Sequence, residues 1–469
     1  MTGIDRRGAL GLMALTASGL AACDRDREVP RRRTPPAPAS LPAQPEPPAG
    51  SVFPLRVESG RTHLLDASGR PFLIVGESAW SLLAQLSRPD IGTFLEDRRR
   101  RGYNAVMVNV LESHFSARPP YNSEGQVPFA VPRRFDDVAE YLRKLDFDTP
   151  IDAYFGLFEH FVQRAAALGM LVLAVPCYAG YGGGEQGWWA AMKRSDPDTL
   201  RHYGRYLGQR FRGHRNLLWV HGGDFNVPDR DRVEALAQGI LEYDRTSLHT
   251  YHGARGTGAH DWMPEARWLK LGNVYTKEVS YEAALRQRAA RPSEPFFLIE
   301  AYYENYADAR PDRRLTRLSA YQALLSGACG QLSGHDDIWQ FRPNWRQALD
   351  STTARSMSVL AAVFGELAWW TLVPDTGGRF LRSDPGAGFE RVAAAVAGDG
   401  RFALAYVPAQ RETVIATEVL AGPRVRVQWI DPIDGRRLAV ERFGESALPR
   451  PGPNAAGDPD WLLLAESVK

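Results

Sequence analysis

Two carboxylic acids end apolar runs of strand length, and they are the residues best placed to do chemistry. Asp224 ends the run that starts at Trp219, and Glu300 ends the run that starts at Phe296. An apolar run that stops at a single acid is typical of a buried parallel strand that delivers one charged group to the rim of a sheet. Two such groups in one cleft would supply the paired carboxylates that glycoside hydrolysis requires.

The elements that would position these acids alternate along the chain. Eight apolar strands begin near residues 72, 103, 170, 216, 248, 271, 295 and 330, and helical segments separate most of them, although the link between the fifth and sixth is poorly marked. Eight alternations over about 300 residues predict an α/β fold of the (β/α)8 TIM barrel type. No Gly-x-Gly-x-x-Gly turn follows the first strand, which argues against a doubly wound dinucleotide-binding sheet.

The strand count gives the two acids matched positions. Reactive groups of such barrels lie at the carboxyl ends of strands, so Asp224 would follow strand four and Glu300 would end strand seven. These ends can bring two carboxyl groups to about 5 to 5.5 Å, the separation that direct nucleophilic attack needs. Shelter beside His221 would raise the pKa of Asp224 and let it protonate a leaving oxygen, while Glu300 would stay ionised and attack. The alternative is that each acid only pairs with an arginine.

Further side chains at or just past the predicted strand ends are candidates for binding a sugar. The aromatic candidates, which would stack on a sugar ring, are Trp80, Tyr178, Tyr181, Trp188, Tyr275, Tyr303 and Trp339. The polar candidates, which would bind hydroxyls or orient the acids, are Asn109, His221, Tyr251, His252, Glu304 and His335. Aromatic residues also fill cores, so we expect about half of the aromatic set to line the cleft. A structural histidine and a loop-capping Glu304 are the alternatives for the polar set.

Metal and serine chemistry have weaker support. His335, Asp336 and Asp337 could join another histidine in a metal site, but neither His-x-His nor His-Glu-x-x-His spacing occurs. The chain has no Gly-x-Ser-x-Gly elbow, and the glycine run at 182–184 lacks the Gly-Lys-Ser/Thr of a phosphate-binding loop. We therefore expect neither a metal nor a cofactor.

Composition restricts the partners. With 469 residues, 44% of them hydrophobic, and 12 Trp, the chain can bury a large core in two or three domains at most. Its 57 Lys and Arg and 55 Asp and Glu give a net charge of +2, so no overall field draws it to nucleic acid. Three cysteines are too few for a disulfide framework, and Cys177 and Cys329 are expected to be buried small hydrophobes.

The N-terminus has the pattern of an export signal. Arg6-Arg7 precede an apolar run that ends at Ala22 and is too short for an ordinary membrane span, and the segment from Leu20 to Cys23 resembles the bacterial lipobox. The pattern predicts lipidation of Cys23 and a periplasmic or cell-envelope location, with membrane contact only through that anchor. The paired arginines also resemble a twin-arginine signal, and an ordinary secretory signal is the alternative.

The pattern changes again beyond Pro374, where short alternating strands are separated by glycine-containing turns. The expected strands are Phe389–Ala397, Phe402–Val407, Thr413–Thr417, Val425–Ile430 and Arg437–Val440. They predict a small antiparallel β-sandwich of roughly 90 residues. The predicted organisation is an export signal at 1–23, a Pro-rich disordered linker at 24–50, the barrel at 51–374 and the sandwich at 375–469.

Several motifs stand in an order that carries a family resemblance. They are Gly69-Arg70-Pro71-Phe72, Gly76-Glu77-Ser78-Ala79-Trp80, the segment from Tyr181 to Trp188, the segment from Trp219 to Asp224, Glu300-Ala301-Tyr302-Tyr303-Glu304, and Gly327-Ala328-Cys329-Gly330 through Gly334 to Trp339. From about Leu55 to Pro374 the chain resembles the apiosidase-like family, glycoside hydrolase family 140. The last domain resembles the β-sandwich, often labelled collagen-binding, that commonly follows this barrel.

The resemblance implies roles for both acids. Asp224 would be the acid/base and Glu300 the nucleophile, although Ala301 stands where many relatives have proline. We therefore expect an exported, lipid-anchored, retaining glycoside hydrolase whose partner is an oligo- or polysaccharide of plant or microbial origin, with apiose-containing pectin as one candidate. The alternatives are a non-catalytic carbohydrate-binding surface lipoprotein and a metal-dependent hydrolase. The motifs specify neither the sugar nor the oligomeric state.

Overall fold

The computed structural model describes residues 50–468 apart from 113, 132–133, 307–311 and 445. The predicted export signal, Cys23 and the linker up to residue 49 lie outside the described residues. None of the described helices has both the length and the hydropathy that a membrane span requires.

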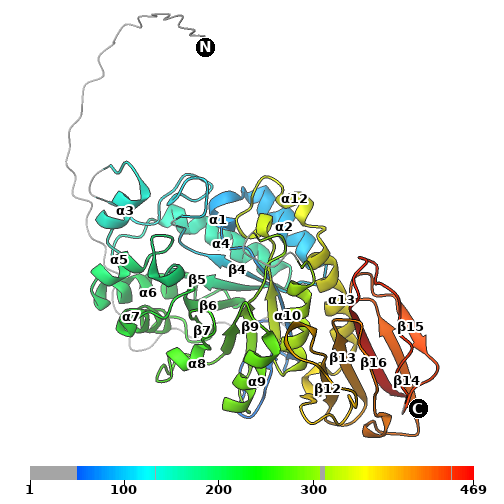
Figure 1. Cartoon of the computed structure of the whole chain (residues 1–469). Coiled ribbons are helices and arrows are strands. Elements are labelled where there is room, and N and C mark those ends of the chain that lie inside the picture. Colours follow the sequence, from blue (N-terminus) through cyan, green and yellow to red (C-terminus); the bar gives the residue numbers. More distant parts are fainter. Residues whose placement is uncertain (1–49, 113, 132–133, 307–311, 445, 469) are drawn as a thin grey trace, which may run out of the picture. The chain divides into compact units, whose positions relative to one another are not determined.

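Eight parallel strands form the central sheet, in the order β7-β6-β5-β4-β3-β10-β9-β8 (Figure 1). They are β3 (Ile74–Ser78), β4 (Ala105–Asn109), β5 (Leu171–Val175), β6 (Leu217–Gly222), β7 (Leu248–His252), β8 (Gly272–Tyr275), β9 (Phe296–Glu300) and β10 (Gly330–Ser333). An isolated bridge between His249 and Leu269 connects β7 to the approach of β8. Asn273 strengthens this seam, because its amide donates to Thr250 Oγ1 and to the Tyr251 carbonyl, each at 2.8 Å. The sheet is thus a nearly closed barrel, and the predicted fold is confirmed.

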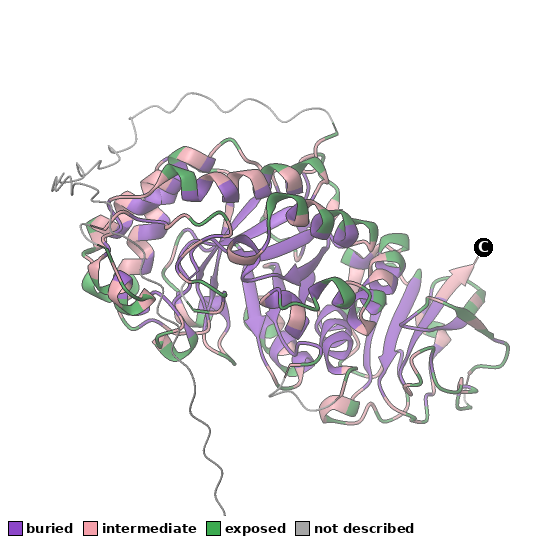
Figure 2. Ribbon diagram, turned by 90° about the horizontal axis from the view of Figure 1, so that it is seen from above, coloured by how far each residue is buried: buried purple, intermediate pink, exposed green. Residues whose placement is uncertain are grey.

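Helices surround this sheet and expose their outer faces (Figure 2). The longer ones are α2 (Arg88–Arg100), α4 (Asp152–Ala167), α6 (Pro197–Phe211), α7 (Arg230–Leu241), α9 (Ser280–Ala290), α10 (Leu315–Leu325) and α13 (Thr352–Glu366). The shorter ones are α1 (Leu82–Gln85), α3 (Val138–Lys144), α5 (Trp189–Arg194), α8 (Ala259–Trp262), α11 (Asp336–Trp339) and α12 (Trp345–Ala348). Helix α8 has only four residues, which explains why the sequence marks the link between the fifth and sixth barrel strands so poorly.

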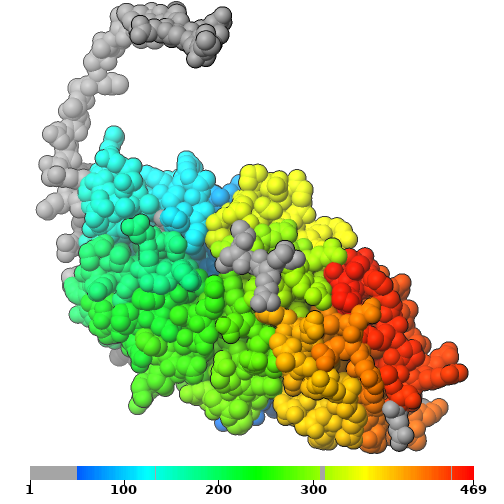
Figure 3. Space-filling view, in the orientation of Figure 1, coloured from blue at the N-terminus to red at the C-terminus, as the bar shows by residue number. Residues whose placement is uncertain are grey.

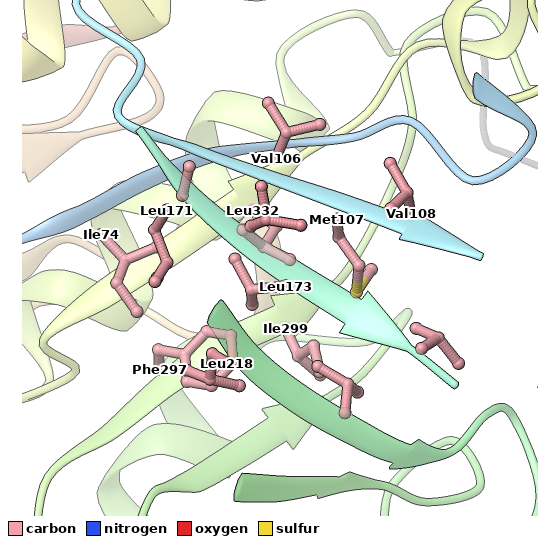
Figure 4. Close-up of a cluster of buried hydrophobic side chains, with 14 of the residues drawn as sticks. Ile74, Val106, Met107, Val108, Leu171, Leu173, Leu218, Phe297, Ile299 and Leu332 are labelled. Atoms are coloured by element: carbon pink, nitrogen blue, oxygen red, sulfur yellow. The ribbon is translucent and has the colours of Figure 1, made fainter. Parts of the chain in front are cut away.

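The barrel wall is packed with apolar side chains. Figure 4 shows such side chains from β3, β4, β5, β6, β9 and β10 crowded among the strands. Gly76 on β3 is required there, because a Cβ at this position would lie 2.1 Å from the Leu332 side chain of β10. Before the barrel, β1 (Leu64–Leu65) pairs antiparallel with β2 (Pro71–Phe72).

The long connection from Phe115 to Thr149, called the excursion below, packs on the barrel through aromatic side chains. Phe129 contacts Phe147, Tyr203 and Trp188 with ring centroids 5.1 to 6.4 Å apart. Figure 3 shows the cyan atoms of the excursion directly against the green atoms of the chain that follows β5. Trp188 therefore belongs to this buried cluster, and the excursion is fixed on the barrel rim.

The C-terminal domain is one six-stranded antiparallel sheet in the order β11-β12-β13-β16-β14-β15. Its strands are β11 (Leu372–Pro374), β12 (Ala393–Ala397), β13 (Phe402–Val407), β16 (Trp461–Val468), β14 (Arg424–Ile430) and β15 (Arg437–Val440). The expected strand Thr413–Thr417 is wrong, since only the isolated bridge of Ile415 with Leu381 occurs there. Strand β16 was not predicted, because its buried first half reads Trp-Leu-Leu-Leu-Ala without the alternation of a half-exposed strand.

The sheet shares its core with the barrel. One face packs Ala395, Leu404 and Leu462 into the hydrophobic cluster that contains the barrel residues, and the other face has a core of its own. Arg317 of α10 is buried at this junction and binds Asp460 at 2.6 Å and Asp458 at 2.7 Å. The sheet and the barrel are therefore joined by apolar packing and by a buried ion pair.

Candidate active site

A left-handed turn presents Asp224 after the fourth barrel strand. Gly222, Gly223 and Asp224 have successive φ angles of +81°, +120° and +51°. Side chains rarely tolerate this region, and a non-glycine residue there is often found at a functional site. Both glycines are also required by space, because a Cβ on Gly222 would lie 2.6 Å from the His252 carbonyl and one on Gly223 would lie 2.2 Å from the Tyr178 ring. The Gly-Gly-Asp sequence thus aims the Asp224 carboxyl group at the cleft.

The two oxygens of Asp224 have different surroundings. Oδ2 accepts a 2.6 Å hydrogen bond from the Tyr178 hydroxyl. Oδ1 is buried and has no hydrogen-bond partner among the described residues. A carboxyl group held by one oxygen, with the other unpartnered, is suited to exchanging a proton with a bound molecule.

Glu300 is the last residue of β9 and faces Asp224. An oxygen of Asp224, a ring nitrogen of His252 and an oxygen of Glu300 all lie within 4.8 Å of one another. His252 Nε2 lies 3.0 Å from Glu300 Oε2. A β-bulge between Val274 and Tyr275 places Tyr275 opposite Glu300 in the neighbouring strand. Two carboxyl groups, one imidazole and one phenol therefore meet at the barrel mouth.

Burial and charge shift the titration of this group. Burial, followed by the charge of Asp224, raises the pKa of Glu300, and the hydrogen bond with His252 opposes that rise. Burial also lowers the pKa of His252, but the hydrogen bond to Glu300 and the charge of Asp224 outweigh it, so the pKa lies above the ordinary 6.5. The ionisation of Glu300 and that of His252 therefore depend on each other through their hydrogen bond.

The acids open into a cavity of about 270 Å³. Besides both acids, the predicted residues that line it are Trp80, Asn109, Tyr178, Tyr181, Tyr275, Tyr303 and Trp339. The residues that line it without having been predicted are Phe115, Gln186, Arg255, Lys277 and Tyr306. Six of the seven aromatic candidates are brought together, more than the expected half.

Edge-to-face ring contacts build the cavity wall. Trp80 packs against Tyr178 at 5.5 Å between centroids, and its indole N–H donates to the Tyr303 hydroxyl at 2.9 Å. Phe115 packs against Trp339 at 5.0 Å. Tyr181 is 58% exposed at the entrance. Aromatic rings that meet at tilted or edge-to-face angles, together with phenol hydroxyl groups, suit a ligand that has both apolar ring faces and polar edges, as a sugar has.

Two cations lie at the same mouth. The Arg255 guanidinium is 5.9 Å from the ring centroids of Tyr181 and Tyr275. Lys277 Nζ is 4.3 Å from the centroid of Tyr306, and its charge acts to lower the pKa of Glu300. The site therefore combines two acids with two basic groups.

Six predicted residues do not line the cavity, and three of them, Trp188, His221 and His335, have their contacts elsewhere. Trp188 is fully buried in the aromatic cluster of the excursion. His221 faces the helices, where its Nε2 lies 2.9 Å from His249 Nδ1. His335 begins α11 and accepts the Asp337 backbone N–H. The expectation that His221 shelters Asp224 is thus not met, because the His221 ring packs against His249 and Trp268 instead.

Tyr251, Glu304 and His252 support the site from behind. The Tyr251 hydroxyl donates to the Phe225 carbonyl at 2.7 Å and so holds the turn that follows Asp224. Glu304 accepts the Thr353 backbone N–H at 2.7 Å and so binds the first turn of α13, not the loop that follows it in sequence. His252 contacts Glu300 directly but does not line the cavity.

Asp224, His252 and Glu300 form the one group among the described residues whose atoms are close enough to hold a metal ion. Among the described residues, His335, Asp336 and Asp337 do not form such a group with His221 or His252. In the trio, His252 Nε2 already faces Glu300 at hydrogen-bond distance.

A parallel barrel with two close carboxyl groups after its fourth and seventh strands, in an aromatic-lined cavity, defines a glycoside hydrolase. Residues 58–371 match the family model described as "Apiosidase-like, catalytic domain", and the chain belongs to this family. Residues 373–466 match the model described as "Putative collagen-binding domain of a collagenase".

Solved structures share the fold. One titled "Glycoside hydrolase" has a TM-score of 0.74 and 20% identity, and the match covers 89% of this chain and 98% of that one. A glycoside hydrolase family 5 protein from Bacteroides vulgatus ATCC 8482 also has a TM-score of 0.74 and 20% identity, and the match covers 89% of this chain and 95% of that one. The comparison with curated proteins found no match.

Proposed function

We propose that Asp224 and Glu300 hydrolyse a glycosidic bond with retention of anomeric configuration. The observation that carries this proposal is the approach of their carboxylate oxygens to within 4.8 Å. Retaining glycosidases place the two carboxyl groups about 5 to 5.5 Å apart, whereas inverting enzymes need about 6.5 to 9.5 Å to admit a water molecule. A carboxylate this close can attack the sugar directly.

The first step would form a glycosyl ester. The Glu300 carboxylate attacks the anomeric carbon while Asp224 gives its proton to the leaving oxygen, so the glycosidic bond breaks and an alcohol departs. In the second step Asp224 takes a proton from water, whose oxygen attacks the same carbon and displaces Glu300. The unpartnered Oδ1 of Asp224 suits this exchange, since no protein group competes for its proton among the described residues.

The lining of the cavity supports a carbohydrate substrate with acidic neighbours. Tyr181 and Trp339 offer faces for sugar rings. Arg255 and Lys277 offer positive charge beside the acids, which suits carboxylate-bearing residues next to the cleaved bond. The matched family is named after apiosidases, which favours apiose as the released sugar. The substrate we propose is therefore apiose linked to uronic acids in pectin. The enzyme would meet it outside the cytoplasm, as an exported protein anchored through Cys23.

Product analysis tests this function. The full chain is incubated with aryl glycosides and with pectic fractions such as rhamnogalacturonan II, and released sugars are separated and identified. Release of apiose or another monosaccharide, retained in the presence of a chelator, supports the proposal. Binding without release would favour the non-catalytic carbohydrate-binding protein, and chelator-sensitive release would favour a metal-dependent hydrolase.

A further inference from the structure

His252 occupies the space between the two acids. It ends β7 and is fully buried. Its Nε2 lies 3.0 Å from Glu300 Oε2, and its Nδ1 lies 3.1 Å from the Gly253 carbonyl oxygen. An acceptor therefore stands beside each ring nitrogen, as a doubly protonated imidazole needs. The Asp224 backbone N–H also donates toward Nδ1, at 3.3 Å, so Nδ1 has one acceptor and one donor beside it.

The proposed reaction places one negative charge in this space at every stage. In the resting enzyme Glu300 is ionised and Asp224 carries the proton. In the glycosyl ester Glu300 is neutral and Asp224 is ionised. The charge moves over a few ångströms while its magnitude stays the same, so a fixed cation in contact with both positions would stabilise both states.

We propose that His252 is a positioning residue that remains an imidazolium through the reaction and provides the fixed counter-charge for whichever acid is ionised. This inference rests on the proposed function. The raised pKa of His252 agrees with it: burial lowers this pKa, and the hydrogen bond to Glu300 is the largest of the effects that outweigh burial. Of the side chains packed on the ring, Trp80 at 5.8 Å and Tyr275 at 4.9 Å are neutral. The charged groups nearby are the two acids and, at the cavity mouth, Lys277 and Arg255, and the charge of Lys277 also acts on Glu300.

Nuclear magnetic resonance tests the charge state without any substrate. The full chain is labelled with ¹⁵N-histidine, and the His252 ring signals are identified by their loss in His252→Gln. We expect both nitrogens to be protonated at pH 7, and we expect the pKa of His252 to fall in Glu300→Gln, because this variant removes the charge that Nε2 faces in the resting enzyme. A neutral ring at pH 7 in the wild type, or a pKa unaffected in Glu300→Gln, would overturn the proposal.

The pH profile of kcat/KM tests the effect on catalysis. Gln at position 252 keeps a hydrogen-bond donor but has no charge, so His252→Gln should lower kcat about 10²-fold with little change in KM. The acidic limb should move to higher pH, because the imidazolium no longer lowers the pKa of Glu300. An unmoved limb with near wild-type kcat would overturn the proposal.

His202→Gln is the matched control. His202 Nδ1 lies 3.0 Å from Asp148 Oδ1, the same distance as the His252 pair, but on α6 and away from the cavity. This variant should keep both kcat and the acidic limb. If the wild type hydrolyses no glycoside, the proposed function fails, while the resonance experiment still decides the charge of His252.

Discussion

The Tyr178 hydroxyl donates a 2.6 Å hydrogen bond to Asp224 Oδ2, and the Tyr178 ring fills the space where a side chain on Gly223 would stand. One aromatic residue therefore fixes both the carboxyl group and the turn that carries it. The unusual φ of +51° at Asp224 persists because its neighbours on both sides are constrained. The catalytic competence of Asp224 should depend on this contact.

Removing the hydroxyl in Tyr178→Phe should lower kcat for an aryl glycoside about 10- to 100-fold, as expected for a hydrogen bond to a charged group. The ring stays in place, so the thermal midpoint should change little. Steady-state kinetics and a melting curve on the same preparation measure both effects. Unchanged kcat would show that the hydrogen bond does not orient the acid.

Adding a methyl group in Gly223→Ala should disturb the turn. The new Cβ would stand 2.2 Å from the Tyr178 ring, in backbone that alanine adopts poorly, so kcat should fall about 10²-fold or more. Gly365→Ala is the control, because this glycine lies in helix α13 with nothing within 4 Å of an added Cβ. Equal kcat in the two variants would contradict the account of the turn.

Asp224→Asn and Glu300→Gln should each lower kcat about 10³-fold or more, because each removes one partner of the two-step reaction. Asn and Gln are nearly the same size as the acids they replace. The circular dichroism spectrum and the urea midpoint of each variant should therefore match those of the wild type. Substantial activity in either variant would remove that acid from the mechanism.

Arg317→Met should destabilise the protein by about 3 to 5 kcal/mol, because it leaves the fully buried Asp460 without its cation. Arg313→Met is the matched control, since Arg313 binds Asp458 from a position with 49% of its side chain exposed and should cost at most about 1 kcal/mol. Urea unfolding measures both. Equal losses would show that the junction between barrel and sheet does not depend on the buried pair.

Acid should weaken the fold through the His221–His249 pair. Burial lowers the pKa of His221 well below 6.5 and that of His249 to about 4. The unfolded chain therefore binds these protons more readily than the folded one, so their contribution to stability is complete above about pH 6.5 and falls as the pH drops toward 4. The urea midpoint should decline over that window, and less steeply in His249→Gln. Identical slopes in the two proteins would contradict this assignment.

Strand positions and both acids could be predicted because the barrel strands are short apolar runs with sharp ends. The side of the sheet that each side chain faces could not be predicted. Every residue of β6 and nearly every residue of β7 is buried, so the sequence shows no alternation of polar and apolar residues that would identify the cleft side. His221 and His252 therefore look alike in sequence, although only His252 reaches the acids.

The cations of the cleft were missed for a different reason. Arg255 and Lys277 lie in loops after β7 and β8, and loop conformation depends on packing against distant segments. A basic residue shortly after each of two consecutive strands was the available signal. Phe115 likewise joins the cleft only because the excursion folds back over the rim.

The stereochemistry of transfer tests the central claim most directly. The enzyme cleaves an aryl glycoside in the presence of methanol, and proton magnetic resonance assigns the anomeric configuration of the methyl glycoside, which does not mutarotate. The 4.8 Å approach of Asp224 and Glu300 predicts a methyl glycoside with the configuration of the substrate. A product of inverted configuration would contradict direct attack by Glu300.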